Sequence, residues 1–480
     1  MKLIAIALCL LALSSAKLWK NQMEDDKLFE TEENSNVFWY DQRLDHFNPQ
    51  QEGTFKQRYY DIDQYWDPET GPLFLYICGE GTCRQPADNS FVVNLAKKFN
   101  GRVLALEHRF YGETQPTEDW STENLRFLTP DQGLADLAQF ATEKSREFSE
   151  KHGIPHRRWI CVGGSYPGAL SAWFRYKYPH VAFASLSSSG VVKAIADYHE
   201  YDEQVFFSTS KSGSECPERF IKAHKYIESI VNSDNRIEAF KTFGYDKDMV
   251  DGEFYYFIGD LVAGPAQYGG RTDFCNGLMA VEDDMDQIIE YLVNFAKQGG
   301  MNLETYTAEF TANTTIDYSK NMRQWTYQTC ANLGYFQTPA KAEGVPPMRP
   351  ANIELDFWED FCERTFGINI FPDADHWNSR YGAKTPAATK IIFTNGGEDP
   401  WQHASVTETD NPHLIPIVID CDDCAHCVDL HGDFPTDAPE LTEARSRIAD
   451  IFEKWIQDEY TMEKTFPSEA MANLRELLSK

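Results

Sequence analysis

The chain has 480 residues, of which 42% are hydrophobic and 14% aromatic, so it can form a large core and either two or three domains or one domain with a large insertion. Its formal net charge of −31 argues against nucleic acid as a partner, because phosphate binding requires basic patches. The acidic surface suits an acidic compartment and, equally, simple solubility.

The amino terminus predicts a secretory signal peptide over residues 1–16. A lysine at position 2 precedes an apolar run from Leu3 to Leu13, and small residues follow up to Ala16. A membrane anchor is the competing interpretation, but the run is shorter than the roughly 18 apolar residues that a spanning helix needs. We therefore expect a secretory-pathway protein without a membrane anchor, in the lysosome or the extracellular space.

The cysteines fit an oxidising compartment. Ten remain after the signal peptide, which predicts several disulfides, and Cys161, inside an apolar run, is the one expected to stay a free thiol. Cys421, Cys424 and Cys427 with His426 also have the spacing of a zinc site, but disulfides explain them better in this compartment, and no metal is expected. The sequon at Asn313 agrees with secretion.

The first part of the chain alternates strands with helices. Apolar runs at 57–60, 72–78, 102–107 and 182–187 predict strands, and helical patterns occupy about 90–99 and 134–148. Such alternation predicts a mostly parallel sheet covered on both faces.

One strand ends in an unusual turn. The run from Trp159 stops at Gly163-Gly164-Ser165, and a helical pattern begins at once and continues to Tyr178. This is the arrangement of the nucleophile elbow of α/β-hydrolases, in which a serine sits on a tight strand-to-helix turn. The usual G-x-S-x-G pattern would need glycine at position 167, where this chain has Pro167.

The strand–helix rhythm is interrupted and then returns. Residues 195–378 are helical, aromatic and cysteine-bearing, whereas 390–395 and 413–419 again read as strands, and 441–459 as a helix. We predict an α/β-hydrolase domain in two parts, 37–194 and 379–480, with an inserted helical cap domain at 195–378. Separate tandem domains are the alternative, which the short final segment weakens.

The two late strands are each followed by a residue that the serine requires. Asp399 follows the first strand and His426 the second, in the order serine, acid, histidine of this fold. His403 and His431 are competing bases. A neutral imidazole would take the proton of Ser165, and the carboxylate would fix the imidazole tautomer.

Backbone N–H groups would stabilise the oxyanion that forms in the reaction, and we expect no cofactor. We expect one donor from Tyr166, at the start of the helix, and a second from Gly79 or Glu80, in the loop after the strand at 72–78.

Taken together, six ordered motifs resemble the prolyl-type serine peptidases, the family of lysosomal Pro-X carboxypeptidase, dipeptidyl peptidase II and thymus-specific serine protease. The motifs start at Asp41, Glu107, Gly163, Arg323, Asn395 and Ala425, and Pro167 in the elbow is typical of this family. The resemblance implies a helical cap over the active site and exopeptidase cleavage next to proline, with Ser165, Asp399 and His426 as the triad.

The resemblance also implies a peptide substrate with proline near one terminus. Trp325, Tyr327 and Trp401, together with the ring of Tyr166, are candidate walls of a proline pocket, since flat apolar faces suit a rigid ring. The sequence leaves the oligomeric state undecided, with a homodimer as one option. Cys427 stands where related peptidases tend to have a second histidine, which leaves the cleavage direction open between carboxypeptidase and dipeptidyl peptidase.

Two other functions use the same features. A carboxylesterase or lipase would share the fold and the triad, because a fold does not choose its substrate. A secreted binding protein with a dead site is the third candidate, and the complete set of Ser165, Asp399 and His426 speaks against it.

Overall fold

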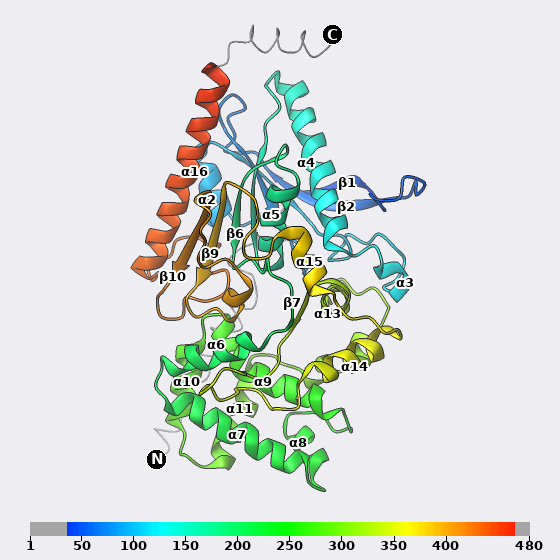
Figure 1. The fold of residues 1–480 in the computed structure, drawn as a ribbon, viewed down its shortest axis with the longest axis vertical. Helices are drawn as coiled ribbons and strands as arrows, with labels where there is room; N and C mark the ends of the chain where they lie inside the picture. The colour runs from blue at the N-terminus through cyan, green and yellow to red at the C-terminus, as the bar shows by residue number, and fades with distance from the viewer. Residues whose placement is uncertain (1–35, 466–480) are drawn as a thin grey trace.

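The computed structural model describes residues 36–465, so the predicted signal peptide at 1–16 lies outside the described residues. Its centre is an eight-stranded sheet in the order β1-β2-β4-β3-β5-β6-β9-β10 (Figure 1). The strands are β1 (Val37–Arg43), β2 (Thr54–Ile62), β3 (Leu73–Ile77), β4 (Arg102–Leu106), β5 (Trp159–Gly164), β6 (Ala182–Ser188), β9 (Ile391–Gly396) and β10 (Leu414–Ile419).

The sheet is mostly parallel. Strand β2 pairs antiparallel with β1 and β4, and all other neighbouring strands run parallel. Strands β3, β4, β6 and β9 are buried along their whole length, as expected for parallel strands covered on both faces. This sheet, with a helix starting directly after β5, confirms the predicted α/β-hydrolase fold class.

Helices cover the two faces of the sheet. On one face, α2 (Phe91–Phe99) and α16 (Pro439–Thr465) pack on the strands through one buried apolar cluster. On the other, α4 (Pro130–His152) and α5 (Tyr166–Lys177) contribute to a second cluster. Figure 1 shows α2 and α16 on one side of the strands and α4 on the opposite side. The short α3 (Thr122–Leu125) precedes α4.

A mostly helical region, defined here as residues 199–381, connects β6 to β9 and lies below the sheet in Figure 1. Its α-helices are α6 (His199–Ser210), α7 (Glu215–Val231), α8 (Arg236–Thr242), α9 (Asp251–Gln267), α10 (Arg271–Ala280), α11 (Met285–Gln298), α12 (Ala308–Thr311), α13 (Met322–Gln328), α14 (Leu355–Phe366) and α15 (Ala374–Tyr381). Single-turn helices are η3 (Leu303–Tyr306), η4 (Thr329–Leu333) and, after β9, η5 (Pro400–Ala404). The division into domains after residues 194 and 378 stays a prediction.

Three strands were not predicted from the sequence. Strand β1 begins with the apolar run Val37 to Tyr40, which is typical of a strand, but Val37, Phe38 and Trp39 are exposed and the strand is held by its pairing with β2. Strands β7 (Ile195–Asp197) and β8 (Gly334–Phe336) form a small parallel pair that ties the start of the helical region to its middle.

Among the described residues, four disulfides join cysteines that lie close together in the fold. They are Cys78–Cys83, Cys216–Cys275, Cys330–Cys362 and Cys421–Cys424. Cys161 is a buried free thiol, as predicted, and Cys427 is also free. Within residues 36–465, no group of three or more His, Cys, Asp or Glu side chains could hold a metal ion. No helix in that range is both long enough and apolar enough to cross a membrane.

Candidate active site

Ser165 occupies a strained turn between β5 and α5. Its backbone has φ 63° and ψ −129°, a conformation that a non-glycine residue adopts only where the surrounding structure enforces it. The Ser165 N–H donates to the carbonyl of Ser188 at the end of β6, at 2.9 Å. The turn is therefore held by the sheet itself.

Glycines make room for Pro167 in this elbow. A Cβ atom on Gly79 would lie 2.2 Å from Cγ of Pro167, and one on Gly163 would lie 2.3 Å from the Pro167 carbonyl oxygen. Both distances are far below a van der Waals contact. Gly79 thus makes room for the Pro167 ring, and Gly163 makes room for the backbone of the same residue.

Asp399 and His426 form a hydrogen-bonded pair. The Nδ1 atom of His426 lies 2.8 Å from Oδ2 of Asp399, and the other carboxylate oxygen accepts from the backbone N–H of Trp401 at 2.9 Å. Burial lowers the pKa of His426, but the neighbouring Asp399 carboxylate outweighs it and holds that pKa well above the usual value. With Nδ1 engaged, Nε2 is the ring atom left to act on a hydroxyl.

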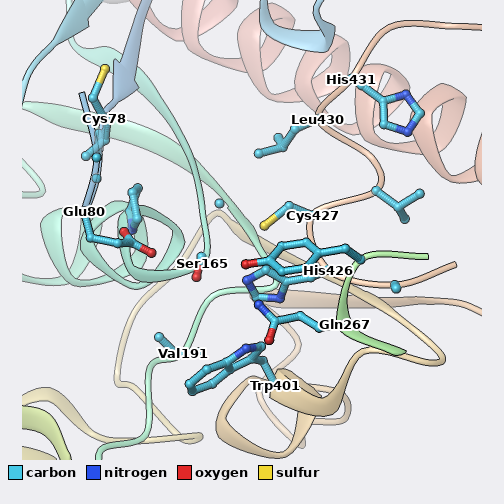
Figure 2. A pocket seen from close by; sticks show the side chains of 18 of the residues that line it. Cys78, Glu80, Ser165, Val191, Gln267, Trp401, His426, Cys427, Leu430 and His431 are labelled. Atoms are coloured by element: carbon cyan, nitrogen blue, oxygen red, sulfur yellow. The ribbon is translucent and has the colours of Figure 1, made fainter. Parts of the chain in front are cut away.

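Ser165 and His426 line the same cavity, which has a volume of about 500 Å³. Figure 2 shows Ser165 and the His426 ring among the residues around this cavity. The sheet half contributes the loop after β3, and the helical region contributes Gln267, Asn321 and Trp325.

Of the predicted oxyanion donors, Gly79 and Glu80 line this cavity, and Tyr166 directly follows Ser165, which lines it. Tyr166 is the first residue of α5, so its N–H has no acceptor within the helix. Gly79 and Glu80 line the cavity in the loop that the Cys78–Cys83 disulfide closes. Asn321 of the helical region donates to the Glu80 carbonyl at 2.7 Å and fixes this loop.

Two of the four predicted pocket aromatics line the cavity. Trp325 and Trp401 line it, whereas Tyr327 does not and packs its ring against Phe366. Residues two apart on a helix point in different directions, so Trp325 and Tyr327 of α13 cannot share one wall. The ring of Tyr166 is fully buried beneath, and its hydroxyl lies 3.0 Å from Nε2 of His108.

The competing assignments have other partners. His403 lies 3.0 Å from the side-chain oxygen of Gln204, and His431, although it lines the cavity, contacts Arg445. Cys421 and Cys424 form a disulfide, so they are not available as zinc ligands. Cys427 lines the cavity beside His426.

Several residues that support the site were not predicted from the sequence. The buried carboxylate of Asp429 accepts hydrogen bonds from Ser188 of β6 and Thr394 of β9, at 2.6 and 2.8 Å. Glu398, next to Asp399, is fully buried against Arg271 of α10. Partners so far apart along the chain give no local sequence signal.

The family model described as serine carboxypeptidase S28 matches residues 42–448. The chain belongs to this family. The S28 membership confirms the resemblance that the motifs indicated, and it makes the protein a serine-type peptidase.

Relatives of this S28 peptidase are also named as serine proteases or carboxypeptidases. It is 36% identical over 409 residues to "Probable serine protease EDA2" of Arabidopsis thaliana, covering 83% of this chain and 81% of the relative. It is 30% identical to the thymus-specific serine protease of Homo sapiens (88% and 87% covered). It is 26% identical to the lysosomal Pro-X carboxypeptidase of Mus musculus (88% and 90% covered).

Proposed function

We propose that this S28 peptidase is an exopeptidase that hydrolyses peptide bonds next to proline, with Ser165 as nucleophile, His426 as base and Asp399 as the orienting acid. The observation that carries the proposal is the His426–Asp399 hydrogen bond at 2.8 Å, on the wall of a cavity that also holds the elbow serine.

The arrangement suits acyl transfer. His426 would take the Ser165 proton on Nε2 as the hydroxyl attacks the carbonyl carbon, and would then deliver it to the leaving amine. Asp399 keeps the Nδ1 proton in place and stabilises the imidazolium that forms. The N–H groups of Tyr166 and of Gly79 or Glu80 would stabilise the negative oxygen of the tetrahedral intermediate.

The size and walls of the cavity support a short peptide end as substrate. Its volume of about 500 Å³ is that of a small-molecule site, which suits the end of a peptide rather than a long groove. Trp325 and Trp401 provide flat apolar walls of the kind that bind a pyrrolidine ring. We place the enzyme in the lysosome or outside the cell, in line with the predicted signal peptide and with relatives named lysosomal and extracellular.

Matched peptides test the proposal. Purified enzyme and Ser165→Ala are incubated, at acidic and neutral pH, with one peptide that has proline second from its amino end and one that has it second from its carboxyl end. Each peptide is also tested with that end blocked.

Release of an Xaa-Pro dipeptide that needs the free amine identifies a dipeptidyl peptidase. Loss of one carboxyl-terminal residue that needs the free carboxylate identifies a Pro-X carboxypeptidase. The proposal fails if neither peptide is cut, or if Ser165→Ala cuts as well as the wild type; hydrolysis of esters alone would then support the esterase alternative.

A further inference from the structure

A buried ion pair connects the helical region to the loop that carries Asp399. Arg271 is the first residue of α10, and its guanidinium donates from Nε and Nη2 to the two carboxylate oxygens of Glu398, at 3.0 and 2.6 Å. The side chains are 4% and 0% exposed. A two-pronged contact of this kind fixes orientation as well as distance.

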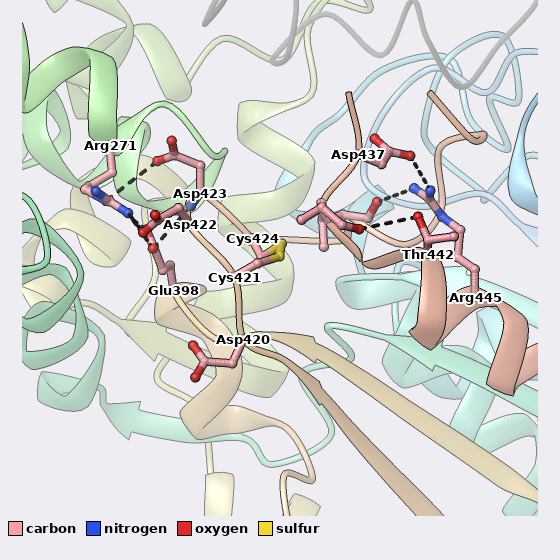
Figure 3. The surroundings of a disulfide bond; sticks show 12 residues. Arg271, Glu398, Asp420, Cys421, Asp422, Asp423, Cys424, Asp437, Thr442 and Arg445 are labelled. Carbon is pink, nitrogen blue, oxygen red and sulfur yellow. Dashed lines mark hydrogen bonds and ion pairs between the residues drawn. A yellow bond between two sulfur atoms is a disulfide. The ribbon is translucent and has the colours of Figure 1, made fainter. Parts of the chain in front are cut away.

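Glu398 also joins the two catalytic loops to each other. One of its carboxylate oxygens accepts from the backbone N–H of Asp423 at 3.2 Å, and its own N–H donates to the carbonyl of Cys424 at 3.0 Å. Asp423 and Cys424 lie in the short loop between β10 and His426, which the Cys421–Cys424 disulfide closes. Figure 3 shows Arg271, Glu398, Asp422 and Asp423 gathered beside this disulfide.

Three more hydrogen bonds tie the helical region to the same loops. The His426 N–H donates to the carbonyl of Gln267, the last residue of α9, at 2.9 Å. The Ser208 hydroxyl of α6 donates to the Glu398 carbonyl at 2.9 Å. The N–H of Thr272, in α10, donates to the Asp423 carboxylate at 3.0 Å. Helices α6, α9 and α10 thus all hold the backbone on which the acid and the base are mounted.

We propose that Arg271 and Glu398 are positioning residues, which lock the helical region onto the loops of Asp399 and His426 so that the acid and base meet only while this region is docked. The proposal rests on the proposed roles of Ser165, Asp399 and His426. On this view the helical region is part of the catalytic framework as well as a cover over the cavity.

The burial of Glu398 explains why the two loops depend on the docked helical region. If Arg271 moved away, the buried Glu398 carboxylate would keep only the partly exposed Lys211 ammonium, at 3.4 Å, as a charged partner, and a poorly compensated buried charge is unfavourable. The loops are therefore expected to keep this conformation only while the helical region is docked. A displacement of about 1 Å in a catalytic group can cost about 100-fold in rate.

The test uses Arg271→Met, Glu398→Met and the double variant, in which no buried charge remains unpaired. For each, folded protein is quantified by thermal unfolding and gel filtration, and kcat, KM and the pH profile of kcat/KM are measured on the better proline peptide. We expect kcat per folded molecule to fall by about 100-fold in Arg271→Met with KM little changed.

The pH profile separates positioning from stability. If Asp399 no longer faces His426, its carboxylate no longer raises the pKa of the imidazole, so the acid limb of kcat/KM moves to lower pH. The double variant is expected to recover the wild-type unfolding temperature and to stay slow, and it keeps the test decisive if a single variant does not fold.

Arg349→Met is the matched control. Arg349 pairs with Asp202 at 3.1 Å, both side chains are buried to within 1%, and its hydrogen bonds go to Asp202 and Gln337 rather than to the catalytic loops. The Arg349→Met variant should be less stable than the wild type but should have the wild-type kcat and the wild-type acid limb of kcat/KM.

The inference is wrong if Arg271→Met keeps the wild-type kcat and the wild-type acid limb of kcat/KM. It is also wrong if the double variant regains the wild-type kcat, or if Arg349→Met loses as much kcat as Arg271→Met. Failure of the proposed function looks different. In that case the wild type itself does not cut proline peptides, and a fluorophosphonate does not label Ser165.

Discussion

The proposed nucleophile and its two proposed partners are held in different ways. Ser165 is fixed by its own sheet, through the hydrogen bond to Ser188 and the close packing of Gly163 against Pro167. The loops of Asp399 and His426 begin at the ends of β9 and β10, but they are tethered by side chains and carbonyls of the helical region. The elbow is thus a local product of the sheet, whereas the acid–base pair depends on a segment far away in the chain.

The largest expected effect comes from removing the nucleophile. Ser165→Ala should lower kcat by about 10⁶-fold, because removing the serine of such a triad abolishes the covalent route. The fold should be unaffected, since the Ser165 backbone makes the sheet contact. Kinetics and thermal unfolding check both statements, and substantial residual turnover would show that another group attacks the bond.

Asp399→Asn tests the other half of the comparison. We expect a loss of about 10⁴-fold in kcat, because the amide favours the wrong imidazole tautomer. In the wild type, kcat/KM should fall as pH drops through the pKa of His426, which the Asp399 carboxylate holds above the usual 6.5. That acid limb should lie at lower pH in Asp399→Asn, and an unmoved limb in pH-rate measurements would assign it to a different group.

Gly79→Ala tests whether local packing is what supports the elbow. The new methyl group would collide with the Pro167 ring, and overpacking of this kind costs about 1–3 kcal/mol and shifts the Tyr166 and Gly79 amides. Activity and unfolding temperature should both drop. Gly79→Ala combined with Pro167→Gly, which restores G-x-S-x-G, should regain much of the loss; if it does not, the collision with Pro167 is not the cause.

The smallest effect on rate is expected for Asp260, in helix α9 of the helical region. Desolvation raises the pKa of its carboxyl from 3.8 to about 6. A carboxyl that binds its proton more tightly when folded stabilises the protein below the unfolded pKa, and this contribution is lost as pH rises to the folded value.

Asp260→Asn should therefore raise the free energy of unfolding at pH 7 to 8 by up to about 3 kcal/mol, with little gain near pH 4. Denaturant unfolding at both pH values checks it. A gain that is equal at both values would show that the carboxyl does not titrate in this range, and kcat should stay the same throughout.

The sequence predicted the parts of the site that depend on local patterns. Gly163-Gly164-Ser165 between an apolar run and a helix predicted the elbow, and Asp399 and His426 each follow a recognisable strand. Helical spacing also distinguishes Trp325 from Tyr327, because residues two apart on a helix point in different directions. Arg271 and Glu398 could not be predicted, because a buried ion pair between distant segments has no periodicity. Strand β1, in contrast, does carry an apolar β-prone run, Val37 to Tyr40, which the predicted strands did not include.

The position of the helical region within the chain also has a consequence for biosynthesis. Strand β6 pairs directly with β9, Ser185 opposite Ile391, although the whole helical region is synthesised between them. Until β9 is synthesised, the edge of β6 opposite β5 has no partner strand, and such edges invite wrong pairing and aggregation. Contacts this distant in sequence also slow folding. Chain assembly should thus depend on protection of β6 until β9 and β10 have emerged.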